Sequence, residues 1–551
     1  MVPVNSLLFW LCNFAAANAL SLDNHNYPRY SDVVDLGYAQ YQGARLGNGV
    51  DQFLGMRYAK APLGGLRFRA PEDPAVDRST QNATKVSQIL VDSMEFGPIC
   101  VGVGETADAE YAEDCLFVNV FKPSAAIETS KLPVWVYIQG GGFALNSNSN
   151  YNGSGVVEQS GNGIVFVNFN YRVGALGFLA SEAVRRDGHL NAGLLDQRLL
   201  LHWVRKNIAK FGGDPNHVVI HGASAGAGSV VHHLTAYGAK QQERLFVGAV
   251  AESPYSPTQR TVSEMEFQYD RLLRAAGCSS LNCLRGIDIE RFMAISRITA
   301  FPGAVSENPL PVEYWLPVID GTLIVDRMQR LLDSGRFHHV PLLVGDDTNE
   351  GSYFGYNAST VEEVMNFIKN NYPRLDSAQL QRISQLYPIQ NPVPQHAAYF
   401  PSASAVFGDF AFTCPGNRIA SAMARDFSPD QVWNYRFNVQ DEVTLASGLG
   451  VSHLLETSAI FGPAYVTPPA VIYSTANSRI IPITSQFFIS FIQKLNPNAV
   501  KAPAAPVWNT WGRGSGQRMR LQTNNTAMED VPSDLIDKCR LWETLANTLQ
   551  I

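Results

Sequence analysis

The sequence predicts an α/β architecture with a large, mostly parallel central sheet flanked by helices. Short apolar runs rich in β-branched and aromatic residues recur along the chain, and several are continuous rather than alternating. Such runs are typical of strands that are covered on both faces. The strand candidates are 132–138, 164–169, 218–220, 246–250, 341–344 and 432–437. Helical patterns lie between them, the clearest over 192–210, and strand–helix alternation favours an α/β fold.

The composition indicates one large folded domain. The chain has 551 residues, of which 46% are hydrophobic and 17% are charged, and its formal net charge is −7. This content is enough for a large core and too apolar for a disordered chain. The acidic balance excludes the basic footprint of a nucleic-acid-binding protein. Because no repeat or linker interrupts the chain, we expect a single domain over 20–551.

The first 19 residues read as a secretory signal peptide. They contain the apolar run Leu7 to Leu11 and end in Ala17-Asn18-Ala19, a small-x-small cleavage pattern. This segment is too short to span a membrane, and no later stretch reaches about 18 uninterrupted apolar residues. The sequence therefore predicts a secreted protein without stable membrane insertion.

Cysteines and sequons agree with export. Seven cysteines are present, and Cys12 would leave with the signal peptide. The remaining even number is expected in an oxidising compartment. Four Asn-x-Ser/Thr sequons are candidate glycosylation sites, namely Asn82, Asn152, Asn357 and Asn524.

The segment 218–230, VVIHGASAGAGSV, contains the motif Gly222-x-Ser224-x-Gly226. It directly follows an apolar strand candidate and precedes a helix-compatible stretch. This is the strand–turn–helix setting in which a strained turn presents a nucleophilic serine above a sheet edge. Glycines are needed at 222 and 226 because side chains there would clash with the turn. We therefore predict that Ser224 is a nucleophile.

A glycine-rich loop precedes this motif. Residues 138–143 read IQGGGF and follow the strand candidate 132–138. Acyl transfer places negative charge on the former carbonyl oxygen, and each preorganised backbone donor stabilises that charge by about 3–4 kcal/mol. Glycines let the backbone approach closely enough to aim its N–H groups. We expect Gly141, Gly142 and Ala225 to form this oxyanion hole.

A serine nucleophile needs a histidine base and a carboxylate that orients it. In folds with this motif the chain order is serine, acid, histidine. His453 lies in a glycine-containing loop after a strand candidate, whereas His396 lies in a Pro-rich stretch typical of surface loops. The sequence chemistry favours His453 but leaves His396 open. The acid is also open, and its candidates are Glu350, Asp346, Asp347 and Asp320.

Several motifs in order resemble the type-B carboxylesterase/lipase family, which includes cholinesterases and fungal lipases. They run from about residue 30 to the C-terminus and include FGGDPNHVVIHGASAG (211–226), EDCLFVNVFKP (113–123), TNEGSYF (348–354) and HLLETSAIFG (453–462). The resemblance implies the α/β-hydrolase fold of a secreted fungal member. It also implies a catalytic triad of Ser224, Glu350 and His453.

The resemblance further implies structural pairs. The implied disulfides are Cys100–Cys115, Cys278–Cys283 and Cys414–Cys539. The implied ion pairs are Arg57–Glu113 and Arg172–Asp196.

Three departures from the family pattern narrow the classes of ester that we expect as substrate. Ala223 stands where many relatives carry Glu, so a negative charge beside the acyl site is missing. The loop between Cys100 and Cys115 is short and has no Trp. It therefore resembles neither the long lid of the family's fungal lipases nor the Trp-containing loop of its choline-ester hydrolases. Leu454 occupies a position where a small residue is common. Ser253 matches a position near the active site in relatives.

These observations predict a secreted serine carboxylic ester hydrolase that acts on a neutral small-molecule ester through an acyl-serine intermediate. No cofactor or metal is implied. One alternative is a biosynthetic esterase or acyltransferase acting on a secondary metabolite, and another is a lipase. A non-catalytic binding or adhesion protein is disfavoured because the serine, acid, base and glycines are all present.

Overall fold

The computed structural model describes residues 29–77, 80–82, 96–146, 151–240, 243–466, 471–474, 476–512 and 516–551. The predicted signal peptide, residues 1–19, lies outside the described residues. Within the described ranges, no helix is long and apolar enough to cross a lipid bilayer.

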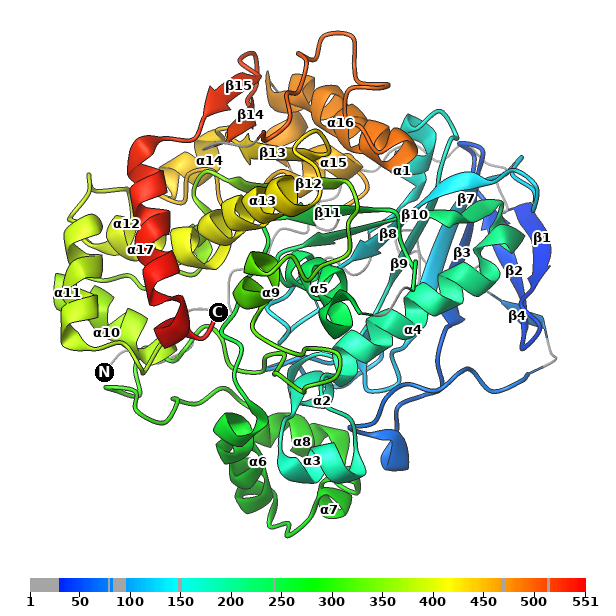
Figure 1. Cartoon of the computed structure of the whole chain (residues 1–551). Coiled ribbons are helices and arrows are strands. Elements are labelled where there is room, and N and C mark those ends of the chain that lie inside the picture. Colours follow the sequence, from blue (N-terminus) through cyan, green and yellow to red (C-terminus); the bar gives the residue numbers. More distant parts are fainter. Residues whose placement is uncertain are drawn as a thin grey trace.

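A 13-stranded sheet forms the centre of the molecule (Figure 1). Its middle is a run of seven parallel neighbours: β9 (Val165–Phe169), β8 (Leu132–Ile138), β10 (Gly213–Ala223), β11 (Gly248–Glu252), β12 (Leu342–Asp347), β13 (Val432–Phe437) and β14 (Gln517–Leu521). The predicted parallel core is therefore confirmed.

The two edges of the sheet are antiparallel, which the sequence did not indicate. One edge consists of β1 (Arg29–Asp35), β2 (Gln40–Arg45), β3 (Val50–Arg57) and β7 (Phe117–Pro123), with β4 (Thr80–Asn82) parallel to β2. The other edge is β15 (Ala527–Asp530), antiparallel to β14. A separate pair joins β5 (Ile99–Cys100) to β6 (Tyr111–Ala112).

All six strand candidates form strands of the parallel core, with shifted ends. β10 begins at Gly213, five residues before the predicted 218, because Gly213 pairs with Leu132 ahead of a register shift. β11 begins at Gly248 rather than at 246. The predicted helix over 192–210 is α4 (Ala192–Asn207) followed by a 3₁₀ turn over Ile208–Phe211.

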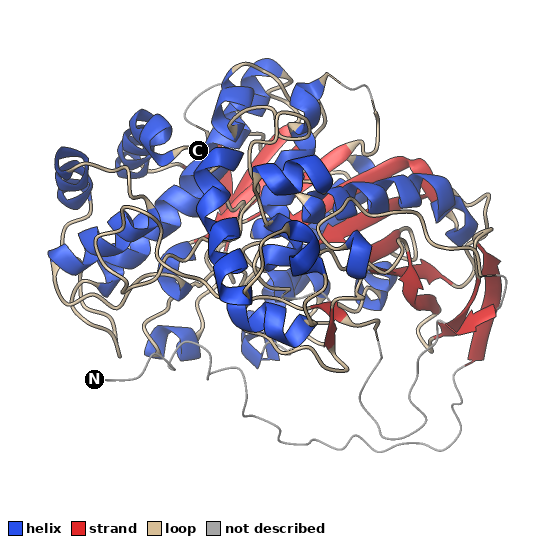
Figure 2. Cartoon of the chain, turned by 90° about the horizontal axis from the view of Figure 1, so that it is seen from below, coloured by secondary structure: helices blue, strands red, loops and turns tan. Residues whose placement is uncertain are grey.

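Helices cover both faces of the parallel strands (Figures 1 and 2). In β8, Val134, Val136 and Ile138 belong to one buried cluster, while Trp135 and Tyr137 belong to another. The first cluster includes residues of α4, α5 (Ala225–Leu234) and α13 (Cys414–Asp426). The second includes residues of α1 (Ser154–Gln159), α15 (Thr457–Phe461) and α16 (Ile481–Lys494). Burial on both faces explains why the strand sequences are continuously apolar.

The remaining helices surround this core. They are α2 (Gly174–Phe178), α3 (Glu182–Asp187), α6 (Val262–Ala276), α7 (Leu281–Arg285), α8 (Ile289–Ile295), α9 (Met328–Asp333), α10 (Val361–Asn371), α11 (Ser377–Leu386), α12 (Phe400–Gly408), α14 (Glu442–Ala446) and α17 (Ser533–Leu549). In Figure 1, α6, α7 and α8 gather with α3 at one end of the molecule, and α10, α11 and α12 gather with α17 at another side.

Within the described residues, three disulfides join Cys100 to Cys115, Cys278 to Cys283 and Cys414 to Cys539. These are the pairs that the family resemblance implied. The third bridge links α13 to α17, so it ties the last helix to a helix that packs on the sheet.

One implied ion pair is present and the other is wrong. Arg172 binds Asp196 at 2.6 Å, and both side chains are buried. Arg57 instead pairs with Asp114 at 2.7 Å, while Glu113 pairs with Arg67 at 2.6 Å. The Arg67–Glu113 pair is buried, whereas the Arg57–Asp114 side chains are 38% and 32% exposed. Adjacent side chains of this irregular segment point to different partners, which a sequence motif does not reveal.

Removing the buried partner should cost far more stability than removing the exposed one. We expect Asp196→Asn to lower the free energy of unfolding by about 3–5 kcal/mol, because Arg172 would be left buried and unpaired. The matched change Asp114→Asn should cost about 1 kcal/mol or less, because its ion pair is solvent-screened. Denaturant unfolding of both variants measures this difference. Equal losses would contradict the assignment of the buried pair.

Candidate active site

Ser224 occupies a sharp turn between β10 and α5. Its backbone angles are φ 57° and ψ −123°, outside the regions favoured by L-residues, and holding such a conformation costs about 1–3 kcal/mol. A side chain at Gly222 would place its Cβ 2.1 Å from the carbonyl oxygen of Gly226, and one at Gly226 would lie 2.0 Å from that of Ile138. Both glycines of the motif are therefore required by close backbone approach.

The end of the neighbouring strand β11 holds this turn in place. The Ser224 amide donates to the carbonyl oxygen of Glu252 at 2.9 Å. The Ser224 carbonyl accepts from the amides of Gly228 at 2.9 Å and Tyr255 at 3.2 Å. The strained serine is thus fixed through its backbone, and its side chain is not used for capping α5.

The predicted oxyanion-hole loop lies directly against the serine. A Cβ on Gly140 would lie 2.9 Å from the Cβ of Ser224. Gly141 and Gly142 have φ values of 110° and 63°, which favour glycine. Across the described residues, the amides of Gly141, Gly142 and Ala225 make no hydrogen bond to a protein acceptor. Three donors near Ser224 are therefore free for a ligand oxygen.

Glu350 begins a 3₁₀ turn, Glu350–Tyr353, that follows β12. The carboxylate is 2% exposed and accepts three hydrogen bonds. Its Oε1 atom accepts from the Ser253 hydroxyl at 2.7 Å and from the Asp347 amide at 2.6 Å, and its Oε2 atom contacts Nδ1 of His453. Three donors therefore hold this buried carboxyl group in place.

His453 lies in the loop between α14 and α15, and this loop is paired with the loop of Glu350. The Asn349 amide donates to the Val451 carbonyl at 2.8 Å, and the Val451 amide donates to the Asn349 side chain at 2.9 Å. The ring packs against Phe412 and Phe354. With Nδ1 on Glu350, the Nε2 atom is buried and has no protein partner among the described residues.

The structure thus brings His453 to Glu350. Among the rival acids, Asp347 meets Glu350 only through its backbone amide, and the other rival candidates have different partners. His396 stacks on Phe400 and contacts the Pro394 carbonyl. The carboxylate of Asp346 accepts from Thr413, and that of Asp320 accepts from Asn191. In the described ranges, Nε2 of His453 makes no hydrogen bond to the Ser224 hydroxyl. Catalytic hydrogen bonds are often long or poorly aligned until substrate binds.

The sequence pattern of the carboxylesterase family matches residues 31–542. This chain belongs to the carboxylesterase family. It is therefore a carboxylic ester hydrolase with the α/β-hydrolase fold.

Similar proteins agree with this assignment. The crystal structure of Aspergillus niger EstA superposes with a TM-score of 0.91 at 54% identity, over 95% of this chain and 99% of that one. A PNB esterase superposes with a TM-score of 0.75 at 27% identity, over 93% and 99%. "Secreted lipase 4" of Gibberella zeae is 31% identical over 83% of this chain and 82% of its own length.

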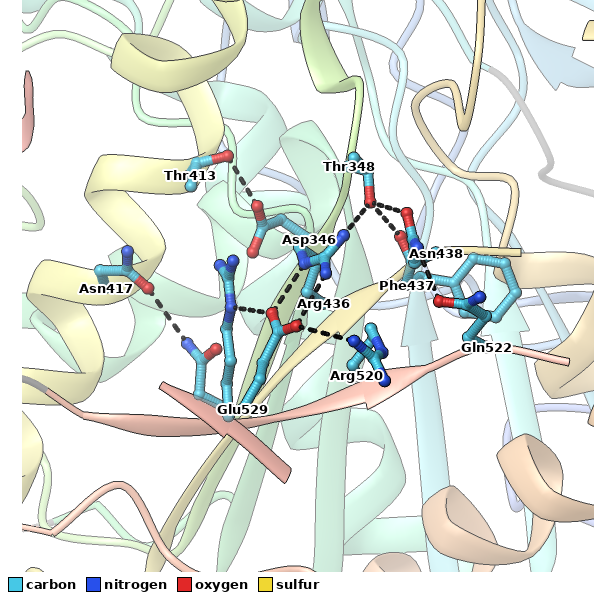
Figure 3. A network of polar contacts seen from close by, with 12 residues as sticks. Asp346, Thr348, Thr413, Asn417, Arg436, Phe437, Asn438, Arg520, Gln522 and Glu529 are labelled. Carbon is cyan, nitrogen blue, oxygen red and sulfur yellow. Dashed lines mark hydrogen bonds and ion pairs between the residues drawn. The ribbon is translucent and has the colours of Figure 1, made fainter. Parts of the chain in front are cut away.

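A polar network behind the acid loop of this carboxylesterase links the sheet edge to the site (Figure 3). Arg436 of β13 binds Glu529 of β15 at 2.7 Å, and Arg518 of β14 binds the same carboxylate at 2.9 Å. Arg436 also donates to the hydroxyl of Thr348 at 2.8 Å. Thr348 in turn donates to the Phe437 carbonyl. The last strands therefore anchor the chain two residues before Glu350.

A buried histidine–glutamate pair beside the serine was missed by the sequence analysis. Trp135 donates its indole N–H to Nδ1 of His221 at 3.1 Å, and Nε2 of His221 lies 2.9 Å from Glu252. Indole nitrogen can only donate, so Nδ1 must accept and His221 is neutral, with its proton on Nε2. Burial lowers the pKa of His221 to about 3, in agreement. This pair is thus a hydrogen bond rather than a salt bridge.

The other oxygen of Glu252 contacts the Thr457 hydroxyl. Burial raises the pKa of Glu252 to about 8. His221 lies inside the serine motif, directly after the strand candidate 218–220, and belongs to β10 in the structure. A polar residue in a strand that is covered on both faces must find a buried partner, and this is the signal that could have revealed the pair.

The positions that depart from the family pattern have structural explanations. Ala223 is fully buried, so no charge flanks the serine on that side. Leu454 has φ 65°, a left-handed conformation that favours glycine. Its side chain packs against the cluster on the α15–α16 face, which offsets part of the strain. Ser253 contacts Glu350 directly, as described above.

The sequons are distributed over the surface and edges. Asn357 and Asn524 are exposed, and Asn152 is half-buried. Asn82 ends β4 at the antiparallel edge of the sheet.

Because the pKa of Glu252 is raised, we expect the stability of the folded protein to depend on pH. The pKa of Glu252 in the unfolded chain is about 4.3, so the folded protein retains a proton that the unfolded chain releases. Stability should therefore fall as the pH rises from about 5 to about 8. We expect Glu252→Gln, which keeps both hydrogen bonds, to melt higher than the wild type at pH 8, with a smaller difference at pH 5.

Calorimetric melting temperatures between pH 5 and 8.5 measure this effect. The exposed carboxylate of Glu128 provides the control, and Glu128→Gln should leave the pH dependence unchanged. A difference between Glu252→Gln and the wild type that stays constant with pH would contradict the prediction.

Proposed function

We propose that this carboxylesterase hydrolyses neutral small-molecule esters through an acyl-serine intermediate, with Ser224 as nucleophile, His453 as base and Glu350 as the acid. The observation that carries the proposal is the arrangement of His453. Its Nδ1 atom binds the buried Glu350 carboxylate, while Nε2 has no partner in the part of the chain that the structure describes. This arrangement leaves Nε2 available to take a proton. The strained serine follows β10, and β11 lies between β10 and the strand that leads to Glu350.

In the proposed mechanism, Nε2 of His453 takes the proton of the Ser224 hydroxyl as the oxygen attacks the ester carbonyl carbon. The imidazolium that forms is stabilised by the ionised Glu350. The amides of Gly141, Gly142 and Ala225 donate to the oxyanion of the tetrahedral intermediate. The intermediate collapses, the alcohol leaves with the proton from His453, and water repeats these steps to release the acid.

Neutral esters fit the surroundings of the histidine. The rings of Phe354 and Phe412 pack on His453, with centroid distances of 5.1 and 4.4 Å. Phe412 also packs on Tyr255. Ala223 supplies no charge, and no Trp is available between Cys100 and Cys115 to stack on a cationic group. These features favour apolar over cationic substrates.

We further propose that the protein is secreted after removal of residues 1–19 and carries glycans at Asn82, Asn152, Asn357 and Asn524. This proposal is supported by the signal-like leader, the three disulfides and the names of fungal relatives. These include "Secreted lipase 1" of Botryotinia fuckeliana, which is 30% identical over 85% of each chain. Disulfides persist in oxidising compartments.

A lipase is the second candidate, because several relatives are named lipases. The short disulfide loop between Cys100 and Cys115 argues against a long lid. A transferase would use the same triad and differ only in which acceptor replaces water. Higher rates on emulsified than on dissolved ester would support the lipase, and ester formation that depends on added alcohol would support the transferase.

The nucleophile assignment predicts a large loss of rate. Ser224→Ala should lower kcat on p-nitrophenyl acetate and butyrate by about 10⁴-fold or more, because no oxygen remains to form the acyl enzyme. The thermal stability should not fall, since the Ser224 side chain caps nothing. Initial rates and labelling by an organophosphonate measure this, with p-nitrophenyl palmitate included to compare acyl-chain lengths.

Turnover of every ester by Ser224→Ala would exclude the triad. A wild type that neither hydrolyses esters nor becomes labelled would favour a binding protein. Labelling without turnover would indicate a narrow substrate range.

A further inference from the structure

Four carboxyl groups are buried together behind the candidate active site. They belong to Glu252 at the end of β11, Asp347 at the end of β12, Glu350, and Glu456 just before α15, and none is more than 2% exposed. In the described part of the chain, no Lys or Arg forms an ion pair with any of them. They are also not arranged to hold a metal ion, since the described residues contain no such group. Four unpaired buried charges would be prohibitively costly.

Two of the four carboxyls are accounted for by donors. Glu350 accepts from Ser253, from the Asp347 amide and from His453. Glu252 contacts His221 and Thr457. Every carboxyl oxygen of Glu350 and Glu252 therefore has a partner. This is not so for Asp347 and Glu456.

Asp347 and Glu456 have oxygen atoms that lack any conventional donor. Both oxygens of Asp347 and the Oε2 atom of Glu456 are buried without a donor among the described residues. The Oε1 atom of Glu456 accepts from the Tyr435 hydroxyl at 3.1 Å and has a longer contact, 3.4 Å, with the Ser253 hydroxyl. The two side chains lie within hydrogen-bonding reach of each other. Two ionised carboxylates can only accept, so this contact requires a proton.

We propose that Asp347 is a protonated carboxylic acid at neutral pH, that it donates its proton to Glu456, and that this pair is a positioning element for the triad acid Glu350. The inference rests on the proposed function, because it assumes that Glu350 and His453 are members of the catalytic triad. One proton between the side chains satisfies an oxygen on each. It also removes one negative charge from the surroundings of Glu350.

The neighbours of the pair agree with this assignment. The groups that face it are Glu252 from β11, Glu350, Tyr435 from β13, Tyr137 from β8, and Tyr151 and Tyr473. None of them is a cation. Burial raises the pKa of Asp347 well above its ordinary value, and the neighbouring Glu456 raises it further. Burial and the nearby Glu252 also raise the pKa of Glu456, while its contact with Asp347 acts in the opposite direction.

The pair acts on Glu350 by two short routes. The backbone amide of Asp347 donates directly to Oε1 of Glu350. Glu456 contacts the Ser253 hydroxyl, which donates to the same oxygen. The hydrogen bond between Asp347 and Glu456 therefore fixes both groups that hold Glu350. Loss of the donor at 347 should disturb the alignment of Glu350 with His453.

The test compares Asp347→Asn, which retains a neutral donor, with Asp347→Ala, which has none. Both are assayed on p-nitrophenyl butyrate across pH 5 to 9. Asp347→Asn should keep kcat/KM within about threefold of the wild type, and its acid limb should stay within about 0.2 pH unit, because no charge is removed. Asp347→Ala should lose about 10- to 100-fold in kcat with little change in KM, because a misaligned triad slows chemistry rather than binding.

Glu313→Gln is the matched control. Glu313 is another fully buried carboxyl with a raised pKa, but its partners are Tyr255, Tyr372 and the Thr258 amide. This variant should leave the acid limb unchanged. If Asp347→Ala does not fold, Asp347→Leu, which keeps more of the volume but also lacks a donor, takes its place.

Two outcomes would overturn the proposal. If Asp347 were ionised, its charge would favour the imidazolium form of His453, and Asp347→Asn would move the acid limb to lower pH by about half a unit or more. If the donor did not matter, the variants without a donor would be as active as Asp347→Asn. Ser224→Ala is measured beside them, and activity that survives there would refute the triad itself rather than the role of Asp347.

Discussion

The end of β11 is the constraint on which the rest of the site depends. Glu252 accepts the Ser224 amide through its backbone, and Ser253 donates its hydroxyl to Glu350. Two adjacent residues therefore fix the serine on β10 and the acid after β12. Because β11 lies between β10 and β12 in the sheet, its end is the natural junction between the two loops. Ser253 itself has φ 52°, a strained conformation whose amide is held by the Gly345 carbonyl.

This junction explains why the site is surrounded by buried polar groups. A strained serine and a buried carboxylate persist only when their neighbours determine their positions completely. The His221–Glu252 pair fills the space behind the serine, and the Asp347–Glu456 pair fills the space behind the acid. Each is satisfied by keeping protons on groups that would be ionised in water. Burial raises the pKa of Glu252 to about 8 and also raises the pKa of Glu456. The folded protein therefore loses stability at alkaline pH, while the catalytic groups are held rigidly.

The motifs around the serine could be understood locally because their requirements are local. Gly222 and Gly226 are dictated by close backbone approach within a single turn, and a sequence pattern records this directly. The disulfides and the Arg172–Asp196 pair followed from the family resemblance. The implied Arg57–Glu113 pair was wrong, because Glu113 and Asp114 are neighbours and only their burial decides which one meets Arg67. Residue chemistry alone did not separate Glu350 from Asp346, Asp347 and Asp320, and only the family resemblance selected it.

The sequence by itself determined the parallel core, the strained serine turn and the glycine loop, because these depend on hydrophobic periodicity and on steric limits between near neighbours. The family resemblance implied the pairing of His453 with Glu350, but only the tertiary structure decided how these two side chains meet and which buried acids lie together behind them. His453 reaches Glu350 across 103 residues of chain, through loops joined by Asn349 and Val451. Distances of this kind are set by strand order and packing rather than by any local pattern.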